Sequence, residues 1–132
     1  MKKIRVLLLG SAGMAGHVLK YKLEKIPDII KLVDIARSSE LIHAKIEMDV
    51  TDFTNLKKII KEGDFDFVVN CIGILNNVAE DNADQAILMN AYLPHFLERI
   101  TKESSTRIIH ISTDCVFSGI KGDYIETDFK DG

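Results

Sequence analysis

Short apolar runs alternate along this chain with segments in which apolar residues recur every three or four positions. The runs predict β-strands at residues 3–9, 30–35, 45–48, 65–71 and 107–112. The periodic segments predict helices at residues 13–26, 53–62 and 82–102. Strands and helices therefore alternate along most of the chain, and no internal repeat or linker interrupts the pattern.

The breaks between the predicted elements fall at residues that begin or end helices. Pro27 stops the first helix, and Gly63 closes the second. Thr51 or Asp52 is placed to cap the second helix at its N-terminus. Pro94 lies inside the third predicted helix, where its missing N–H predicts a kink or a break.

Apolar strands separated by helices are typical of a parallel sheet that is covered on both faces. Right-handed crossovers then give an α/β, Rossmann-type, doubly wound sheet with the strand order 3-2-1-4-5. We expect residues 1–132 to form one domain of this class. A ligand should bind where the strand order reverses, between the first and fourth strands, at their carboxyl ends.

Composition and charge narrow the class of protein. The chain has 132 residues, 46% apolar and 28% charged, which is enough for one globular domain with a core. The net charge is −3 and the Lys and Arg residues are scattered, so we expect no nucleic-acid partner. No apolar run approaches the roughly 20 residues of a membrane span. The apolar stretch after Lys2 and Lys3 is too short for a signal peptide, so we expect a cytoplasmic protein with no membrane association.

The cysteines and histidines do not predict a metal site. Cys71 and Cys115 lie outside any metal-spaced cluster, and we expect both thiols to be reduced and mostly buried. Each follows a predicted strand, so a redox pair at the carboxyl edge of the sheet is an alternative. The four histidines show neither HxxxH nor HExxH spacing.

The turn after the first predicted strand has the residue types of a phosphate-binding device. The segment Gly10-Ser11-Ala12-Gly13-Met14-Ala15-Gly16 joins this strand to the first helix. Gly10 permits a tight turn, Gly13 lets the backbone approach a pyrophosphate, and Gly16 lets the helix pack closely on the sheet. The helix N-terminus adds free N–H groups and a partial positive charge. We expect residues 10–14 to bind a dinucleotide; an ordinary glycine-rich turn is the alternative.

Asp34 and Arg37, at the end of the second predicted strand, bear on the choice of cofactor. A carboxylate at Asp34 would accept hydrogen bonds from an adenosine ribose 2′-hydroxyl and repel a 2′-phosphate, which favours NAD over NADP. Arg37 opposes this interpretation, because its guanidinium could clamp a 2′-phosphate, unless it lies in a solvated loop. We expect NAD or NADP with a preference for NAD, and we place Asp34, Ile35 and Arg37 in the cofactor site.

Two further segments end strands at the same predicted edge. Asp49 and Val50 are expected beside the adenine, although Asp49 could instead be a helix-capping acid. Cys71, Ile72 and Gly73 are expected to border the nicotinamide-side ribose, where Gly73 allows close approach. The alternative for this second segment is a strand-ending turn that touches no ligand.

Ser112 and Thr113 follow the fifth predicted strand. A hydroxyl donor at this edge could polarise a substrate carbonyl, because it would stabilise developing oxyanion charge. A Ser-Thr pair at a strand end is, on its own, more often turn chemistry.

Together these motifs resemble those of a known family. The chain has GSAGMAG after the first strand, Asp34, DVTD at 49–52, NCIG at 70–73, Asn90, and STDCVFSG at 112–119. This set is similar to that of the extended short-chain dehydrogenase/reductases, and within them to the dTDP-4-dehydrorhamnose reductase branch. The resemblance covers essentially the whole chain. It implies an NAD(P)-dependent oxidoreductase that reduces a nucleotide-activated 4-keto sugar.

The resemblance also implies roles for individual residues. In that family the residue matching Thr113 acts with the Tyr and Lys of a YxxxK motif. The Tyr protonates the sugar C4 oxygen as hydride arrives, and the Lys lowers the pKa of the Tyr and holds the nicotinamide ribose. Thr113 is thereby implied to be catalytic, and Asn90 to support this network at the cofactor. A helix-surface residue is the alternative for Asn90.

Two departures from the family pattern matter. Cys115 stands where this branch usually has an aromatic residue. The YxxxK motif is expected beyond residue 128, and the sequence reaches Gly132 without it. Tyr21 has Lys25 at the required spacing but lies on the first predicted helix, away from the nicotinamide; Tyr124 has an aspartate at that position.

We therefore expect the cofactor-binding half of a reductase, without the substrate-binding part and with negligible turnover on its own. A non-catalytic NAD(P)-binding regulatory subunit, or a sugar-nucleotide epimerase or dehydratase, are the alternatives. A sheet that ends at the fifth strand leaves an unpaired edge and apolar helix surface, so we also expect a homodimer.

Overall fold

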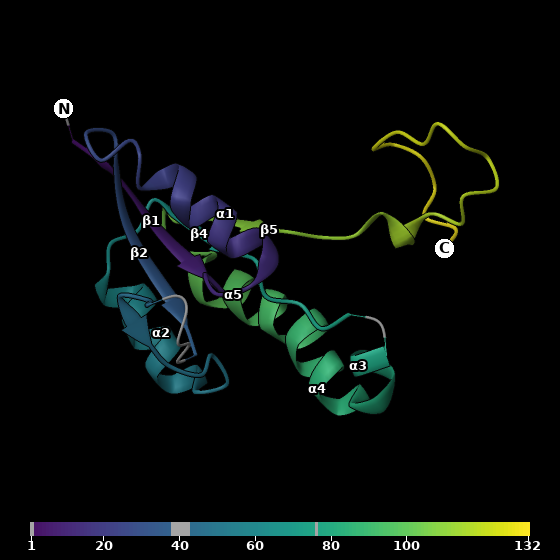
Figure 1. Cartoon of the computed structure of the whole chain (residues 1–132), viewed down its shortest axis with the longest axis horizontal. Coiled ribbons are helices and arrows are strands. Elements are labelled where there is room, and N and C mark those ends of the chain that lie inside the picture. The colour runs from purple at the N-terminus through teal and green to yellow at the C-terminus, as the bar shows by residue number, and fades with distance from the viewer. Residues whose placement is uncertain (1, 38–42, 76) are drawn as a thin grey trace.

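A five-stranded parallel sheet forms the centre of the computed structural model, which describes residues 2–37, 43–75 and 77–132 (Figure 1). The strands are β1 (Ile4–Leu9), β2 (Ile30–Ala36), β3 (Ile46–Glu47), β4 (Phe67–Asn70) and β5 (Arg107–His110). Their order is β3-β2-β1-β4-β5, and all neighbours are parallel. The predicted fold class and strand order are confirmed, with the reversal of order beside β1.

Helices connect the strands where the periodic pattern predicts them. They are α1 (Met14–Leu23), α2 (Phe53–Glu62), α3 (Asn77–Asp81), α4 (Ala83–Ile87), a π-helical turn (Leu88–Tyr92) and α5 (Leu93–Thr101). Asp52 is the residue that caps α2, because its side chain accepts a hydrogen bond from the Asn55 N–H at 3.0 Å.

The side chains of β1 alternate between two apolar clusters. Val6 and Leu8 face α1, whose Leu19 and Leu23 are half-buried against them. Leu7 and Leu9 face the opposite way, into the larger cluster that α2 and α5 complete. Because β1 is buried on both faces, it is a run of apolar residues rather than an alternating strand.

The α1 side of the sheet is open over β5. Helix α1 contacts β1 and β2. Ile109 lies in register with Val69, which belongs to the α1-side cluster, and is 45% exposed. Ile111 beyond it is 46% exposed. The expectation of two covered faces therefore holds at β1 and fails at β5.

The predicted single helix at residues 82–102 is several elements in the structure. It begins earlier than expected, with α3 at Asn77, and α3 and α4 meet at Asn82, whose backbone is not helical (φ −133°, ψ 60°). The π-helical turn directly precedes α5, which has Pro94 in its first turn. Proline lacks the N–H that would bond to the carbonyl four residues back, and the helix widens just before Pro94. Tyr92 and Leu93 keep helical backbone, so the helix does not break at Pro94 as one of the two predicted outcomes required.

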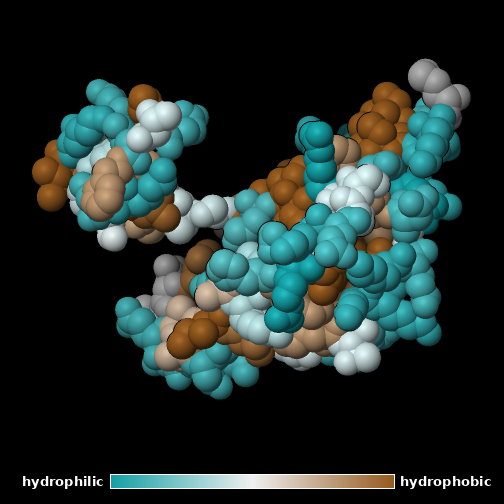
Figure 2. All heavy atoms as spheres, turned by 180° about the vertical axis from the view of Figure 1, so that it is seen from behind, coloured by the Kyte–Doolittle hydropathy of each residue, from teal (hydrophilic) through white to brown (hydrophobic). Residues whose placement is uncertain are grey.

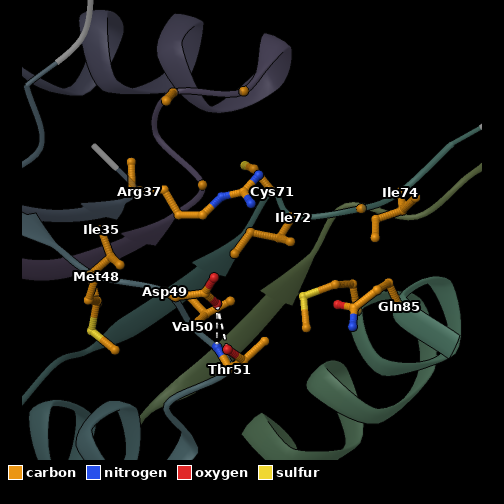
Figure 3. A pocket seen from close by; sticks show the side chains of 16 residues that line it. Ile35, Arg37, Met48, Asp49, Val50, Thr51, Cys71, Ile72, Ile74 and Gln85 are labelled. Atoms are coloured by element: carbon orange, nitrogen blue, oxygen red, sulfur yellow. Dashed lines mark hydrogen bonds between the residues drawn. The ribbon is translucent and has the colours of Figure 1, made fainter. Parts of the chain in front are cut away.

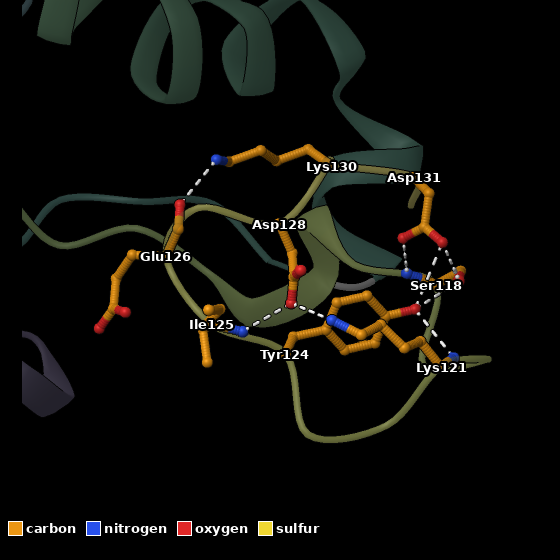
Figure 4. Close-up of polar contacts among 8 residues, drawn as sticks. All are labelled: Ser118, Lys121, Tyr124, Ile125, Glu126, Asp128, Lys130 and Asp131. Carbon is orange, nitrogen blue, oxygen red and sulfur yellow. Dashed lines mark hydrogen bonds and ion pairs between the residues drawn. The ribbon is translucent and has the colours of Figure 1, made fainter.

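The segment after β5 projects away from the sheet as a small lobe on a narrow neck (Figures 1 and 2). We call residues 117–131 the C-terminal lobe. Its ring stack joins Phe117 and Tyr124, whose centroids are 4.6 Å apart. Asp131 accepts hydrogen bonds from the Ser118 N–H at 2.9 Å and the Ser118 hydroxyl at 2.7 Å, and an ion pair joins Lys121 and Asp128 (Figure 4). These contacts are internal to the lobe.

Candidate functional site

The glycine turn after β1 has the geometry of a phosphate-binding loop. Gly10 has φ +81°, a left-handed conformation that side chains other than glycine rarely adopt. Its N–H donates to the Ile35 carbonyl at 2.9 Å, which joins the turn to the end of β2. A Cβ at Gly16 would overlap the Gly10 carbonyl oxygen, so only glycine lets α1 approach the turn this closely. The turn and the helix are therefore closely packed against each other.

The N-terminus of α1 is available to an anion. The N-cap residue is Gly13, whose backbone is extended (φ −77°, ψ 169°). Because glycine has no side chain, no side-chain oxygen caps the helix. The first turn of α1, all of it described, holds no acidic residue. The first N–H groups of a helix have no intrahelical partner and carry a partial positive charge. This arrangement fits the pyrophosphate of a dinucleotide.

A cavity of about 630 Å³ opens at the carboxyl ends of β1, β2, β3 and β4 (Figure 3). Four segments at the ends of strands line it, together with two residues from the helices that follow β4. They are Gly10, Ala12 and Gly13; Ile35, Ala36 and Arg37; Met48, Asp49, Val50 and Thr51; Cys71, Ile72, Gly73 and Ile74; and Gln85 and Met89 from the helices. The cavity lies where strand order reverses, which is where doubly wound sheets bind ligands.

Ten of the predicted cofactor residues line this cavity. They are Gly10, Ala12, Gly13, Ile35, Arg37, Asp49, Val50, Cys71, Ile72 and Gly73. Four others do not. Ser11 and Asp34 are fully buried, Met14 is 81% exposed on the first turn of α1, and Asn90 is exposed and hydrogen-bonds to the lining residue Ile74.

Asp49 lines the cavity and is held in place by its neighbour Thr51. It accepts hydrogen bonds from the Thr51 N–H at 2.9 Å and the Thr51 hydroxyl at 2.8 Å (Figure 3). These two bonds, with the charge of Arg37 nearby, lower the pKa of the Asp49 carboxyl. Asp49 therefore carries a stable negative charge where the sequence predicts the adenine.

Asp34 is occupied by other protein groups. Its carboxylate accepts a hydrogen bond from Lys20 Nζ of α1 at 2.9 Å and one from the Lys45 N–H at 3.2 Å. Burial acts to raise the pKa of the carboxyl, but the contacts from Lys20, Ser11 and Lys45 together outweigh it and the pKa is lowered. Asp34, on which the preference for NAD depends, therefore has two protein partners in this structure.

Asn90 holds the segment that follows β4. Its side-chain amide donates to the Ile74 carbonyl at 2.7 Å and accepts from the Ile74 N–H at 2.8 Å. Asn90 lies in the π-helical turn, so this irregular turn directs the amide at the strand end. Cys71 lines the cavity in the same segment, and burial raises the pKa of its thiol.

Thr113 lies outside the cavity. It is exposed, and its hydroxyl accepts a hydrogen bond from the Cys115 N–H at 3.2 Å. The Cys115 side chain is exposed, so the prediction that both cysteines are mostly buried is wrong for Cys115. Tyr21, on α1, packs against Lys25, two residues beyond the end of this helix, with Lys25 Nζ 4.0 Å from the ring centroid. Neither lines the cavity.

Six residues that line the cavity were not predicted from the sequence. Ala36, Met48, Thr51 and Ile74 adjoin predicted residues, and a slightly wider window at each strand end would have included them. Gln85 and Met89 come from α4 and the π-helical turn, one helical turn apart. No local signal marks them, because their position depends on how the helix packs across β4.

The described residues include neither a candidate metal cluster nor a membrane-spanning helix. No group of three His, Cys, Asp or Glu side chains there could hold a metal ion. No helix in the same part of the chain is both long and apolar enough to cross a membrane.

Residues 4–131 match the family described as RmlD substrate binding domain. The chain belongs to this family. RmlD-family relatives include the dTDP-4-dehydrorhamnose reductase of Mycobacterium tuberculosis, 30% identical over 117 residues, which are 87% of this chain and 34% of that protein. The enzyme of the same name from Burkholderia thailandensis is 28% identical over 127 residues, which are 95% of this chain and 39% of that protein. The chain thus spans little more than a third of these relatives.

Solved structures share the fold of this RmlD-family chain. A hypothetical dTDP-4-dehydrorhamnose reductase from Sulfolobus tokodaii superposes with a TM-score of 0.83 at 30% identity, over 96% of this chain and 45% of that one. The Bacillus anthracis dTDP-4-dehydrorhamnose reductase, solved in complex with NADP, has a TM-score of 0.74 at 22% identity, over 91% of this chain and 40% of that one. The second similarity establishes the fold alone.

Proposed function

We infer that this chain is the cofactor-binding part of an NAD(P)-dependent reductase whose substrate is a nucleotide-activated 4-keto sugar. The observation that carries the proposal is the glycine turn, which opens into a cavity where the strand order reverses. The names of the mycobacterial and Burkholderia relatives support the substrate class.

Each wall of the cavity has a proposed role. The turn at residues 10–14 and the α1 N-terminus would hold the pyrophosphate, and Asp49 and Val50 would contact the adenine. Residues 71–73 would border the second ribose, while Asn90 keeps them in place through Ile74. A bound nicotinamide would supply the hydride.

The acid that protonates the sugar oxygen is not found at this cavity. No tyrosine lines the cavity in the part of the chain that the structure describes. Tyr21 is 57% exposed on α1, and Tyr124 lies in the C-terminal lobe. We propose that Thr113 acts only with a Tyr–Lys pair that these 132 residues do not provide. A module that binds NAD(P) without turnover is the second candidate.

The proposal is tested by titrating the chain with NADH and NADPH in a calorimeter. We expect binding of at least one of them below millimolar concentration, and no reduction of dTDP-4-dehydrorhamnose, because a missing general acid costs a factor of about 10²–10⁴. Absence of binding at millimolar concentration would refute the proposal. Turnover at an ordinary enzymatic rate would refute the assignment as a binding part alone.

Two glycines offer a matched pair of variants for this titration. Gly10 (φ +81°) and Gly119 (φ +82°) have the same unusual backbone, so alanine strains both equally. A Cβ at Gly10 would lie 2.8 Å from Ile72 Cγ1, whereas nothing lies within 4 Å of one at Gly119. We expect Gly10→Ala to abolish binding and Gly119→Ala to retain it.

We also propose a homodimer and a cytoplasmic location. The open side of β5, with Ile109 and Ile111, is the surface on which a second copy would pack. Sedimentation velocity across the micromolar range should show a dimer, and a strictly monomeric chain would refute it. The free thiol of Cys71 suits a reducing compartment.

A further inference from the structure

Asn70 is a buried amide at the end of β4, directly before the residues of that segment that line the cavity. Its side chain is fully buried, and Cys71, Ile72 and Gly73 follow it in the cavity wall. A buried amide whose hydrogen bonds are unmade costs free energy, so both of its ends need partners. Its Oδ1 accepts a hydrogen bond from the Ile72 N–H at 3.1 Å, and its Nδ2 lies 3.1 Å from His110 Nδ1.

These two contacts determine which ring nitrogen of His110 carries the proton. A backbone N–H can only donate, so the Asn70 atom that faces the Ile72 N–H is the amide oxygen. The amide nitrogen therefore faces His110, and this group can only donate. His110 Nδ1 must accept the bond, so the proton of the neutral ring is on Nε2. A buried amide thereby selects one of the two tautomers of an exposed histidine.

The sheet places His110 for this contact. His110 is the last residue of β5 and lies in register with Asn70 across the parallel pair. The Ile111 N–H donates to the Asn70 carbonyl at 3.0 Å, so the backbone ladder continues past the two side chains. The position of the ring is therefore set by paired strands, which hold a side chain more precisely than a loop does.

The segment after β4 is held at two points by two different amides. Asn90 bonds to both backbone groups of Ile74, as described above. Asn70 holds Ile72, two residues earlier, and His110 supplies the acceptor that keeps the Asn70 amide in this orientation. Without that acceptor the Asn70 NH₂ group would be buried and unpaired, and the amide would gain by turning away and releasing Ile72.

We propose that His110 is a positioning residue for the second ribose of the dinucleotide. It acts through Asn70 to fix the backbone at Ile72, and thereby the cavity wall at residues 71–73. This inference rests on the proposed function, because that function places the second ribose against this wall. His110 itself touches no ligand in this scheme.

The test compares a ligand that reaches this wall with one that does not. The first is NADH or NADPH, whichever binds the wild type more tightly. The second is the matching ADP or 2′-phospho-ADP, which ends at the pyrophosphate. In calorimetric titrations, we expect His110→Leu to weaken dinucleotide binding about threefold to tenfold, the effect of one hydrogen bond, and to leave diphosphate binding unchanged.

The outcomes separate this inference from the proposed function. Unchanged dinucleotide affinity in His110→Leu, or an equal loss for both ligands, would overturn the inference and leave the proposed function intact. Failure of both NADH and NADPH to bind the wild type would refute the proposed function itself.

Two further variants show whether the acceptor at Nδ1 is what matters. An asparagine at this position can place its Oδ1 where the imidazole has Nδ1, so His110→Asn should bind the dinucleotide as the wild type does. A loss in His110→Asn as large as that in His110→Leu would overturn the inference. The matched control is His95→Leu, an exposed histidine on α5, which should leave both affinities unchanged.

Nuclear magnetic resonance of the wild-type chain tests the tautomer without any substitution. Long-range ¹H–¹⁵N correlation at about pH 8, where histidine rings are neutral, distinguishes a protonated ring nitrogen from an unprotonated one. His17 is an internal reference of the opposite kind, because its Nδ1 lies 3.0 Å from the Gly13 carbonyl oxygen, which can only accept. We expect His110 to carry its proton on Nε2 and His17 on Nδ1. A His110 ring protonated on Nδ1, or averaging over both tautomers, would overturn the inference.

Discussion

Substituting Gly16 with alanine should damage both the stability of the chain and its cofactor site. An added Cβ would lie within 3.0 Å of three backbone atoms of Gly10 and Ser11, which have no rotamer to change. Such overpacking costs about 3 kcal/mol, the upper end of the usual range, because a backbone must move. Alanine returns about 1 kcal/mol through its helix propensity. The net loss is therefore about 2 kcal/mol.

Thermal unfolding followed by circular dichroism measures this loss. For a chain of this length, 2 kcal/mol lowers the melting temperature by roughly 8 °C. Calorimetric titration with NADPH should show weaker binding in the same variant, although Gly16 does not line the cavity, because α1 and the turn move apart.

Gly73→Ala is the control for the change in stability. A Cβ at Gly73 would meet only Asn90 Oδ1 at an ordinary 3.6 Å, and the backbone there is not left-handed. Its melting temperature should be unchanged within roughly 2 °C. A Gly16→Ala chain that melts like the wild type and binds as tightly would refute the argument that close packing of α1 maintains the turn.

Two further predictions concern side chains that support the site. The Asp34 carboxyl has a folded pKa below its ordinary value of 3.8, so its stabilising effect is complete above that pH and is lost as pH falls through the folded pKa. Between about pH 5 and pH 2, the melting temperature should fall more steeply for the wild type than for the double variant Lys20→Met/Asp34→Asn. Parallel plots of melting temperature against pH would contradict this. Asn90→Ala removes both hydrogen bonds to Ile74 and should cost about 1–2 kcal/mol in urea unfolding. Asn55→Ala, an exposed site on α2, is its control, and equal stability of the two variants would contradict the bridging role.

The alternation of apolar runs and periodic segments was sufficient to predict the sheet order, because each crossover has one preferred hand. The glycine turn was predictable for a similar reason. Its constraints are local: a left-handed residue at Gly10 and a close approach at Gly16 leave a mark in the sequence itself. Ten predicted cofactor residues line one cavity because parallel strands bring their carboxyl ends to one edge.

The state of Asp34 was not predictable in the same way. Its partner Lys20 comes from a helix whose angle on the sheet decides whether the ammonium arrives at the carboxylate. Gln85 and Met89 are comparable, since the break at Asn82 and the π-helical turn set which side of the helix meets β4. The exposure of β5 was also not predictable, because an apolar strand has the same sequence pattern whether or not another element covers it.

The central place of β1 governs the order in which this chain can fold. Its first partner, β2, forms only after the α1 crossover is made, and its second neighbour joins through contacts 61 residues away, as between Arg5 and Asp66. On a ribosome, β1 would emerge first and wait longest for its full set of partners. Such non-local parallel pairing slows the search for the native state, since loop closure must precede the gain from contacts. A synthesis interrupted before β4 would leave the most apolar strand of the sheet exposed along one edge, where chaperones and aggregation compete for it.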